Sequence, residues 1–210
     1  MKSYKLEIKT IVFVVAILSI TIFSVALFTL HMVESEKLGE LLLHYGFLIA
    51  PITLLWVWLE KSLWHLPILQ SSRKTFNIAP DMRGRWEGSL HSSSFEVPQK
   101  FVIEVTQSLT TLHVHAYSSI GISKSILVEI AADDNEDQFT LCFFWQGETP
   151  TNVDDKKFIQ RFNGYTMLHL HDFEKPKSLK GTYFTDFQPA QTHGTIELSW
   201  VSLELKRRLE

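Results

Sequence analysis

Two long apolar runs without charged residues occupy the first third of the chain. There is no Asp, Glu, Lys or Arg from Thr10 to Val33, and there is none from Leu41 to Leu59. At about 1.5 Å of rise per residue, each run would cross roughly the 30 Å hydrocarbon core of a bilayer as a helix. We therefore expect a transmembrane helical hairpin within residues 1–60, with helices at about 10–32 and 41–59.

The residues that flank these runs predict the orientation of the hairpin. A cleaved signal peptide is the alternative for the first run, but the apolar part exceeds the usual signal core of about 7 to 15 residues and no small-residue cleavage site follows. Lys and Arg are concentrated before the first run and after the second, whereas the intervening HMVESEKLGE carries a single Lys. Because the cytoplasmic flanks of membrane helices carry the excess of Lys and Arg, we expect both termini in the cytoplasm.

Beyond a connector at residues 61–80, the hydrophobic pattern changes from continuous runs to alternation. Segments such as FVIEVTQ and HGTIELSW alternate apolar with polar residues, and turn-rich pieces such as AADDNED and FEKPK separate them. A period of two indicates strands with one buried face. The predicted strands start near residues 84, 98, 110, 122, 138, 161, 178 and 193. Eight antiparallel strands can close a small up-and-down β-barrel, which we expect over residues 81–204, followed by a basic tail at 205–210.

One end of this predicted barrel gathers polar and aromatic side chains. Strands joined by hairpins alternate in direction, so one end collects the finish of each odd strand and the start of each even one. A binding pocket needs apolar walls and a few convergent polar groups, and this end offers both. The residues that we expect to bind a ligand there are Tyr117, Ser123, Lys124, Ser125, Trp145, Arg161, Tyr183 and Thr185.

Trp86 lies near the start of the first predicted strand, which places it at the other end of the barrel. It stands between Gly84 and Gly88, which permit close approach of the backbone. We interpret the indole as a structural side chain that points inward with Leu90 and plugs the floor of the barrel, in preference to a ligand contact.

The charge of the barrel region restricts the class of ligand. Residues 80–203 contain 10 Lys and Arg against 16 Asp and Glu, a net charge of −6 with His neutral. Polymeric nucleic acid needs a broad cationic surface, so it is not expected as a partner. A small anion is compatible, because Lys124, Arg161 and nearby hydroxyls could hold phosphates while Trp145 and Tyr183 offer faces on which bases stack.

Neither a metal site nor a catalytic centre is expected. The two H-x-H pairs, at 113–115 and 169–171, alternate with apolar residues and should therefore face outward, on strands that are not neighbours. Cys142 lies in the middle of a predicted strand without an identifiable base, and as the single cysteine it permits no internal disulfide. We expect a binding protein that uses no cofactor, and not an enzyme.

A resemblance to a known family covers essentially the whole chain. A short N-terminal arm and a two-helix hairpin precede a barrel that opens with GRWEGSL and continues through FVIEVTQS, GISKSILVEI, LKGTYFTD and HGTIELSW. This order is similar to that of the two-transmembrane, β-strand-rich effectors of bacterial CBASS anti-phage systems, which are associated with CD-NTase enzymes.

The resemblance implies a function in antiviral defence. A cognate CD-NTase would make a cyclic dinucleotide, the barrel would bind it, and the effector would form homo-oligomers. The helices would then disrupt the bacterial inner membrane and cause abortive infection. The bilayer itself would thus be a partner of a multi-pass membrane protein.

Two other functions stay open at this point. A G-x-W first strand and an eight-stranded barrel also suit a membrane-anchored, lipocalin-like protein that binds a lipid or another apolar ligand. Such a carrier would have Leu, Ile and Phe at its mouth in place of Lys124 and Arg161. The barrel could also be a scaffold that binds another protein.

Overall fold

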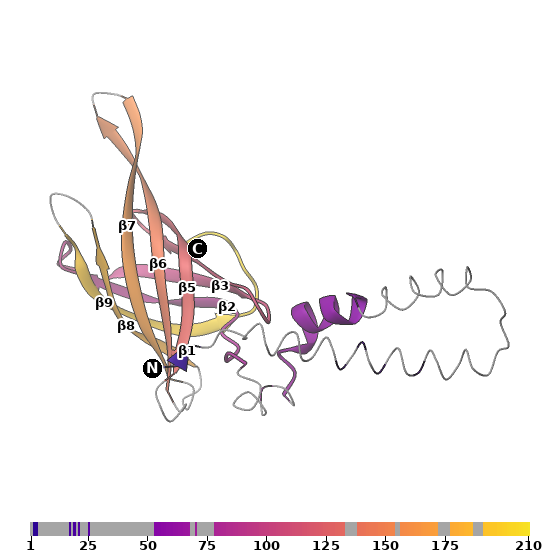
Figure 1. The fold of residues 1–210 in the computed structure, drawn as a ribbon. Helices are drawn as coiled ribbons and strands as arrows, with labels where there is room; N and C mark the ends of the chain where they lie inside the picture. Colours follow the sequence, from indigo (N-terminus) through magenta and orange to yellow (C-terminus); the bar gives the residue numbers. More distant parts are fainter. Residues whose placement is uncertain are drawn as a thin grey trace. The chain divides into compact units, whose positions relative to one another are not determined.

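The chain is described here from a computed structural model (Figure 1). The described residues are 2–3, 17, 19, 21, 25, 53–67, 70, 78–132, 138–153, 156–171, 177–186 and 191–210, with side chains except at 2–3, 149–153 and 156–160. The chain divides into two compact units. One consists of Met1–Lys5, Ala79–Gln107 and Thr111–Glu210, and the other of Leu6–Ile78 and Ser108–Thr110.

Most of the two predicted membrane helices lies outside the described residues. Residues 53–58 are helical and continue into the π-helical turn η1 (Leu59–Leu63), where the Trp64 N–H donates to the Leu59 carbonyl at 3.3 Å. Over the part of the chain that is described, no helix has the length and apolar character needed to cross a membrane. The predicted helical hairpin is therefore not confirmed.

The other unit contains the predicted barrel, and its eight antiparallel strands are confirmed. Each strand pairs with the next along the chain, and pairing between the first and the last closes the barrel (Figure 1). The short strand β1 (Lys2–Ser3) is added to β5 at Ala131 and Ala132. The barrel strands are β2 (Gly84–Ser92), β3 (Gln99–Gln107), β4 (Leu112–Ser118), β5 (Gly121–Ala132), β6 (Phe139–Val153), β7 (Lys156–His171), β8 (Ser178–Thr185) and β9 (His193–Ser202).

The alternation along each strand sorts side chains between the interior and the outer surface. In β6, for example, Leu141 and Phe143 belong to the core cluster, whereas Phe144 is exposed. The longest ladder joins β6 to β7, and this hairpin extends beyond the neighbouring strands in Figure 1. Residues that share the inward parity of a strand therefore decide what fills the barrel.

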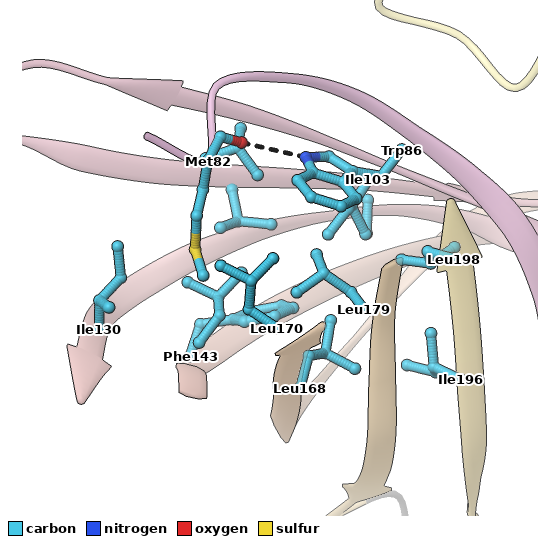
Figure 2. Close-up of a cluster of buried hydrophobic side chains, with 14 of the residues drawn as sticks. Met82, Trp86, Ile103, Ile130, Phe143, Leu168, Leu170, Leu179, Ile196 and Leu198 are labelled. Atoms are coloured by element: carbon cyan, nitrogen blue, oxygen red, sulfur yellow. Dashed lines mark hydrogen bonds between the residues drawn. The ribbon is translucent and has the colours of Figure 1, made fainter. Parts of the chain in front are cut away.

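One end of the barrel is packed solid around Trp86, as predicted. The Trp86 indole N–H donates to the Met82 carbonyl at 3.0 Å, and both side chains are fully buried (Figure 2). The Gln107 side chain fixes the segment that leads into β2, since it accepts from the Met82 N–H at 2.9 Å and donates to the Pro80 carbonyl at 3.0 Å. The floor thus consists of a large indole whose only polar group is satisfied.

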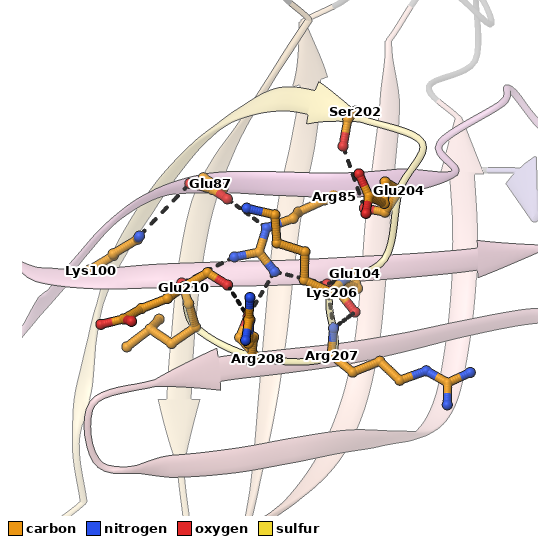
Figure 3. Close-up of polar contacts among 11 residues, drawn as sticks. Arg85, Glu87, Lys100, Glu104, Ser202, Glu204, Lys206, Arg207, Arg208 and Glu210 are labelled. Carbon is orange, nitrogen blue, oxygen red and sulfur yellow. Dashed lines mark hydrogen bonds and ion pairs between the residues drawn. The ribbon is translucent and has the colours of Figure 1, made fainter.

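The C-terminal residues fold over the outer face of β2 and β3. Arg85 and Glu104, with 0% and 2% of their side chains exposed, form an ion pair at 2.8 Å beneath this segment (Figure 3). The Arg85 guanidinium also donates to the carbonyls of Arg208 at 2.7 Å and Leu209 at 3.0 Å. Burial alone would lower the pKa of Arg85, but its hydrogen bonds to Glu87 and Glu104 raise that pKa above its usual value.

The Glu104 carboxylate binds the backbone of the same C-terminal segment. The N–H groups of Lys206 and Arg207 donate to the Glu104 carboxylate at 2.8 and 3.0 Å. Arg207 has a φ of 57°, and this turn lets the two successive N–H groups converge on one anion. The basic tail predicted from the sequence is therefore anchored to the barrel by hydrogen bonds between its backbone and the buried pair of Arg85 and Glu104.

Candidate functional site

A cavity of about 260 Å³ lies at the end of the barrel opposite Trp86. Its wall is made of aromatic and aliphatic side chains with several Ser and Thr hydroxyls. None of the described residues that line it is Asp, Glu, Lys, Arg or His. These residues are Leu90, Ser92, Ser94, Phe95, Phe101, Ala116, Ser118, Ile120, Gly121, Ile122, Ser123, Phe143, Trp145, Phe162, Thr166, Tyr183, Thr185, Thr192 and Ile196.

An aromatic pair from β6 and β7 forms one corner of the cavity. The rings of Trp145 and Phe162 meet edge to face, with centroids 5.7 Å apart and an interplanar angle of 85°. Glycines lie opposite both rings, because Trp145 pairs with Gly164 and Phe162 pairs with Gly147 in the ladder. A β-carbon on Gly147 would lie 2.7 Å from the Phe162 ring, and one on Gly164 would overlap the Trp145 ring. The two glycines thus leave the space in which the rings lie.

Hydrogen bonds fix several polar groups of the wall. The Trp145 indole N–H donates to the Thr166 hydroxyl at 2.9 Å, and both residues are buried. The hydroxyls of Thr185 and Thr192 lie 2.9 Å apart, and the Thr185 N–H donates to the Thr192 carbonyl at 2.8 Å. The end of β8 is therefore joined to the segment that precedes β9, and the Trp145 ring has a defined orientation.

Four of the eight residues predicted to bind a ligand line this cavity. Ser123, Trp145, Tyr183 and Thr185 come from β5, β6 and β8 and all point inward. The prediction that one end of the barrel gathers polar and aromatic side chains around a hollow agrees with the structure for these four. Whether they contact a ligand stays a prediction.

Tyr117 is placed on the other surface of the barrel wall. Its neighbour Ala116 faces the core, so Tyr117 faces outward, although it is buried. Burial first, and the nearby Glu104 second, raise the pKa of Tyr117 above its usual value. The expectation that Tyr117 shares the mouth with Trp145 is therefore wrong, because it overlooked the outward parity that Tyr117 shares with the H-x-H pair of β4.

Ser125 and Lys124 also differ from the expectation. The ladder between β5 and β6 is irregular between Ser125 and Leu127, and the Ser125 hydroxyl accepts a hydrogen bond from the Val114 N–H at 2.9 Å. Ser125 thus completes the backbone pairing of β4 and does not line the cavity. Lys124 alternates with Ser123 and is exposed on the outer surface, opposite His115.

Arg161 is a surface residue, although it belongs to the β6–β7 hairpin that carries Trp145 and Phe162. Its side chain is 67% exposed and pairs with Glu148 across β6 and β7 at 3.1 Å. It is absent from the cavity wall because the next residue, Phe162, takes the inward position. The predicted mouth therefore contains no guanidinium among its described wall residues.

The prediction missed two wall residues of β7, Phe162 and Thr166. Both could have been found by extending the inward parity of Leu168 backwards along the strand, through Thr166 and Gly164 to Phe162. The residues that face the cavity from the β2–β3 loop, Ser94 and Phe95, carry no such periodic signal.

A protein-family model supplies the comparison that bears on this site. The model described as Cap15, cyclic dinucleotide receptor domain, matches residues 77–200. That range spans the barrel from its entry segment to β9 and contains all the described residues that line the cavity. Comparison with curated proteins gives no match.

Proposed function

Because the chain belongs to the family of Cap15 cyclic dinucleotide receptor domains, we propose that it is a membrane effector of a CBASS anti-phage system whose barrel cavity binds a cyclic dinucleotide. The observation that carries this proposal is the cavity itself, which lies wholly within the matched residues. We propose binding as its role, and no catalytic step.

The chemistry of the cavity wall suits a nucleotide. Stacking of a base on an aromatic side chain contributes about 1–3 kcal/mol and tolerates different bases. Trp145, Phe162 and Tyr183 offer such faces, and Ser123 and Thr185 add hydroxyls that can donate or accept. Fixed rings lose little conformational entropy when a ligand binds, which favours affinity.

The phosphates are proposed to contact cations beside the cavity. Lys124 and Arg161 are the proposed cations, although they stand on the outer face of the strands that carry Ser123 and Phe162, so they would meet a phosphate only outside the cavity. The exposed pair between Arg161 and Glu148 is worth little in water, so it does not prevent Arg161 from turning to a phosphate. Tyr117 and Ser125 are not among the proposed contacts. The Tyr117 side chain faces outward, and the Ser125 hydroxyl accepts from the Val114 N–H.

A lipid or another apolar ligand is the second candidate, and a specific observation favours it. The described wall contains Leu90, Ile196 and several Phe side chains but no cation. A thermal-shift comparison of the full-length protein in detergent separates the two ligands. Stabilisation by cyclic di-GMP, cyclic di-AMP or a mixed cyclic dinucleotide supports the proposal, whereas stabilisation by palmitate alone supports the lipid carrier.

We further propose that ligand binding drives self-assembly through an apolar row on the outer surface. The row consists of Leu127, Phe144, Tyr165 and Phe184, which are direct neighbours in register across β5, β6, β7 and β8. Leu127 and Phe184 are 69% and 52% exposed, and the Tyr165 and Phe184 rings are 5.6 Å apart. A hydrogen bond with Cys142, together with burial, raises the pKa of Tyr165 to about 12.

Contiguous exposed apolar residues of this kind are characteristic of interaction surfaces. Assembly in the plane of a membrane needs only a modest gain in contact energy, because anchored proteins have a high effective concentration. The assembled helices of residues 1–60 are proposed to disrupt the inner membrane, with both termini in the cytoplasm.

Replacing Phe184 with glutamate should weaken ligand-dependent assembly at least about tenfold, because it places a charge in the row and removes an apolar contact worth about 1.5–3 kcal/mol. Oligomer size against protein concentration, measured by light scattering with and without cyclic dinucleotide, gives the result. Val201→Glu is the matched control, since Val201 is similarly exposed on β9 outside the row. Equal assembly by the Phe184→Glu protein and the wild type would contradict the proposal.

A further inference from the structure

We propose that the barrel cavity takes one nucleobase of the cyclic dinucleotide, that both phosphates remain outside it, and that the Thr166 hydroxyl donates a hydrogen bond to an acceptor on the base edge. This inference rests on the proposed function and specifies which part of the ligand the cavity recognises.

The size of the cavity supports a single base. Pockets that enclose most of a drug-sized ligand measure about 300–1,000 Å³. The barrel cavity, at about 260 Å³, is smaller than that range. A cyclic dinucleotide contains two bases, two riboses and two phosphates, so it exceeds a drug-sized ligand. The cavity is therefore smaller than a pocket that encloses a whole ligand of this size, which favours entry of one part of the dinucleotide.

The charge of the wall selects which half enters. A phosphate removed from water without a cationic partner carries a large desolvation cost. Among the described residues that line the cavity, none supplies a positive charge. A neutral base, by contrast, gains from contact with Trp145, Phe162 and Tyr183. The base is thus the part that the wall accommodates, and the phosphates stay where water and surface cations reach them.

The direction of one hydrogen bond assigns a role to Thr166. An indole N–H can only donate, so the 2.9 Å contact with Trp145 makes the Thr166 oxygen the acceptor. The Thr166 hydroxyl proton then remains to donate, and the described part of the chain provides no further hydrogen bond to it. Thr166 is 2% exposed and lines the cavity. We therefore infer that its hydroxyl proton donates to an atom of the bound ligand.

The base edges differ in what they offer such a donor. Guanine presents two acceptors, N7 and O6, on one edge, whereas the same edge of adenine combines the N7 acceptor with an amino donor. The Thr166 proton can therefore reach an acceptor on either purine edge, of which guanine offers two and adenine one. In this inference Thr166 contacts the base, and the hydrogen bond from Trp145 orients its hydroxyl.

Nucleosides test the inference because they carry a base but no phosphate. The full-length protein in detergent is first saturated with whichever of cyclic di-GMP and cyclic di-AMP binds, and is then titrated with guanosine, adenosine, uridine, cytidine and inorganic phosphate. We expect at least one nucleoside to displace the dinucleotide and inorganic phosphate not to do so.

Three variants add a second readout for Thr166. Thr166→Val should weaken binding of the displacing nucleoside by about threefold to tenfold, the effect of one neutral hydrogen bond, and Thr166→Ser should restore it. Thr140→Val is the matched control, because the buried Thr140 bonds His169 at 3.0 Å and does not line the cavity. Near-ultraviolet circular dichroism reports whether each variant keeps its packed aromatic core.

The outcomes separate the inference from the proposed function. Dinucleotide binding that no nucleoside displaces, whether or not inorganic phosphate displaces it, overturns the inference and leaves the proposed function intact. Equal nucleoside affinity for Thr166→Val and the wild type overturns the role of Thr166. A protein that binds neither cyclic dinucleotide overturns the proposed function, and the inference with it.

Discussion

Replacing Arg85 with methionine should destabilise the barrel by about 3–5 kcal/mol, the cost of removing one partner from a buried ion pair. Methionine fills much of the volume, but it leaves the Glu104 carboxylate buried without its guanidinium. It also removes the donors to the carbonyls of Arg208 and Leu209. Chemical unfolding of the full-length protein, followed by tryptophan fluorescence, measures the loss.

Arg83→Met is the matched control for this change. Arg83 pairs with Asp81 at 2.8 Å, yet both side chains are partly exposed, so the pair contributes about 0–1 kcal/mol at most. Glu104→Gln made together with Arg85→Met should recover part of the loss, because the uncompensated charge is then absent. If Arg85→Met and Arg83→Met proved equally stable, the barrel would not depend on the buried pair.

Replacing Trp145 with alanine should lower cyclic dinucleotide affinity by about 10- to 100-fold, because one stacked base contributes about 1–3 kcal/mol. The substitution removes the ring that lies edge to face against Phe162 and also the donor that orients Thr166. Calorimetric titration of the full-length protein gives the change in affinity directly.

Two further variants test the geometry behind this prediction. Gly164→Ala keeps the indole but fills the space that it occupies, so it should weaken binding in the same direction. Trp200→Ala is the control, because the Trp200 indole donates to the Arg83 carbonyl at 3.0 Å and does not line the cavity. Affinity that falls equally in the Trp145→Ala and Trp200→Ala proteins would point to general destabilisation and against a stacking role.

The barrel could be predicted from the sequence because its signal is local. The alternation in a segment such as FVIEVTQ predicts which residues face the core, and the turn-rich pieces between such segments predict where the loops lie. The predicted starts near 84, 178 and 193 agree with β2, β8 and β9. The largest difference is at β7, which begins at Lys156 and not near residue 161. Its first residues extend the hairpin with β6, and their sequence has no marked alternation of apolar and polar residues.

The site is predicted less completely, because the end of the barrel at which a residue lies does not show which face of the strand carries its side chain. Trp145 and Tyr183 have inward parity and line the cavity, whereas Tyr117 and Arg161 stand at the same level with outward parity. Combining both criteria selects Phe162 and Thr166 in place of Arg161. The irregular ladder at Ser125 has no signature in the residues GISKSILVEI, since it depends on pairing with β6.

The position of the C-terminal segment depends on contacts that are remote in sequence. Glu104 receives the backbone N–H groups of Lys206 and Arg207, which are more than 100 residues away along the chain. The sequence predicts a basic tail here without indicating what it contacts, and in the structure its backbone binds Glu104. The hydrophobic periodicity of the sequence does not predict such contacts, because each joins a single residue to a turn that is distant along the chain.

Whether the barrel binds a cyclic dinucleotide is measured by a calorimetric titration of the full-length protein in detergent with cyclic di-GMP, cyclic di-AMP and a mixed cyclic dinucleotide. We expect saturable binding of at least one of them, with one ligand per cavity, and a loss of affinity of about 10- to 100-fold in the Trp145→Ala protein. Binding of palmitate with no binding of any cyclic dinucleotide, or dinucleotide binding that Trp145→Ala leaves unchanged, would contradict this expectation.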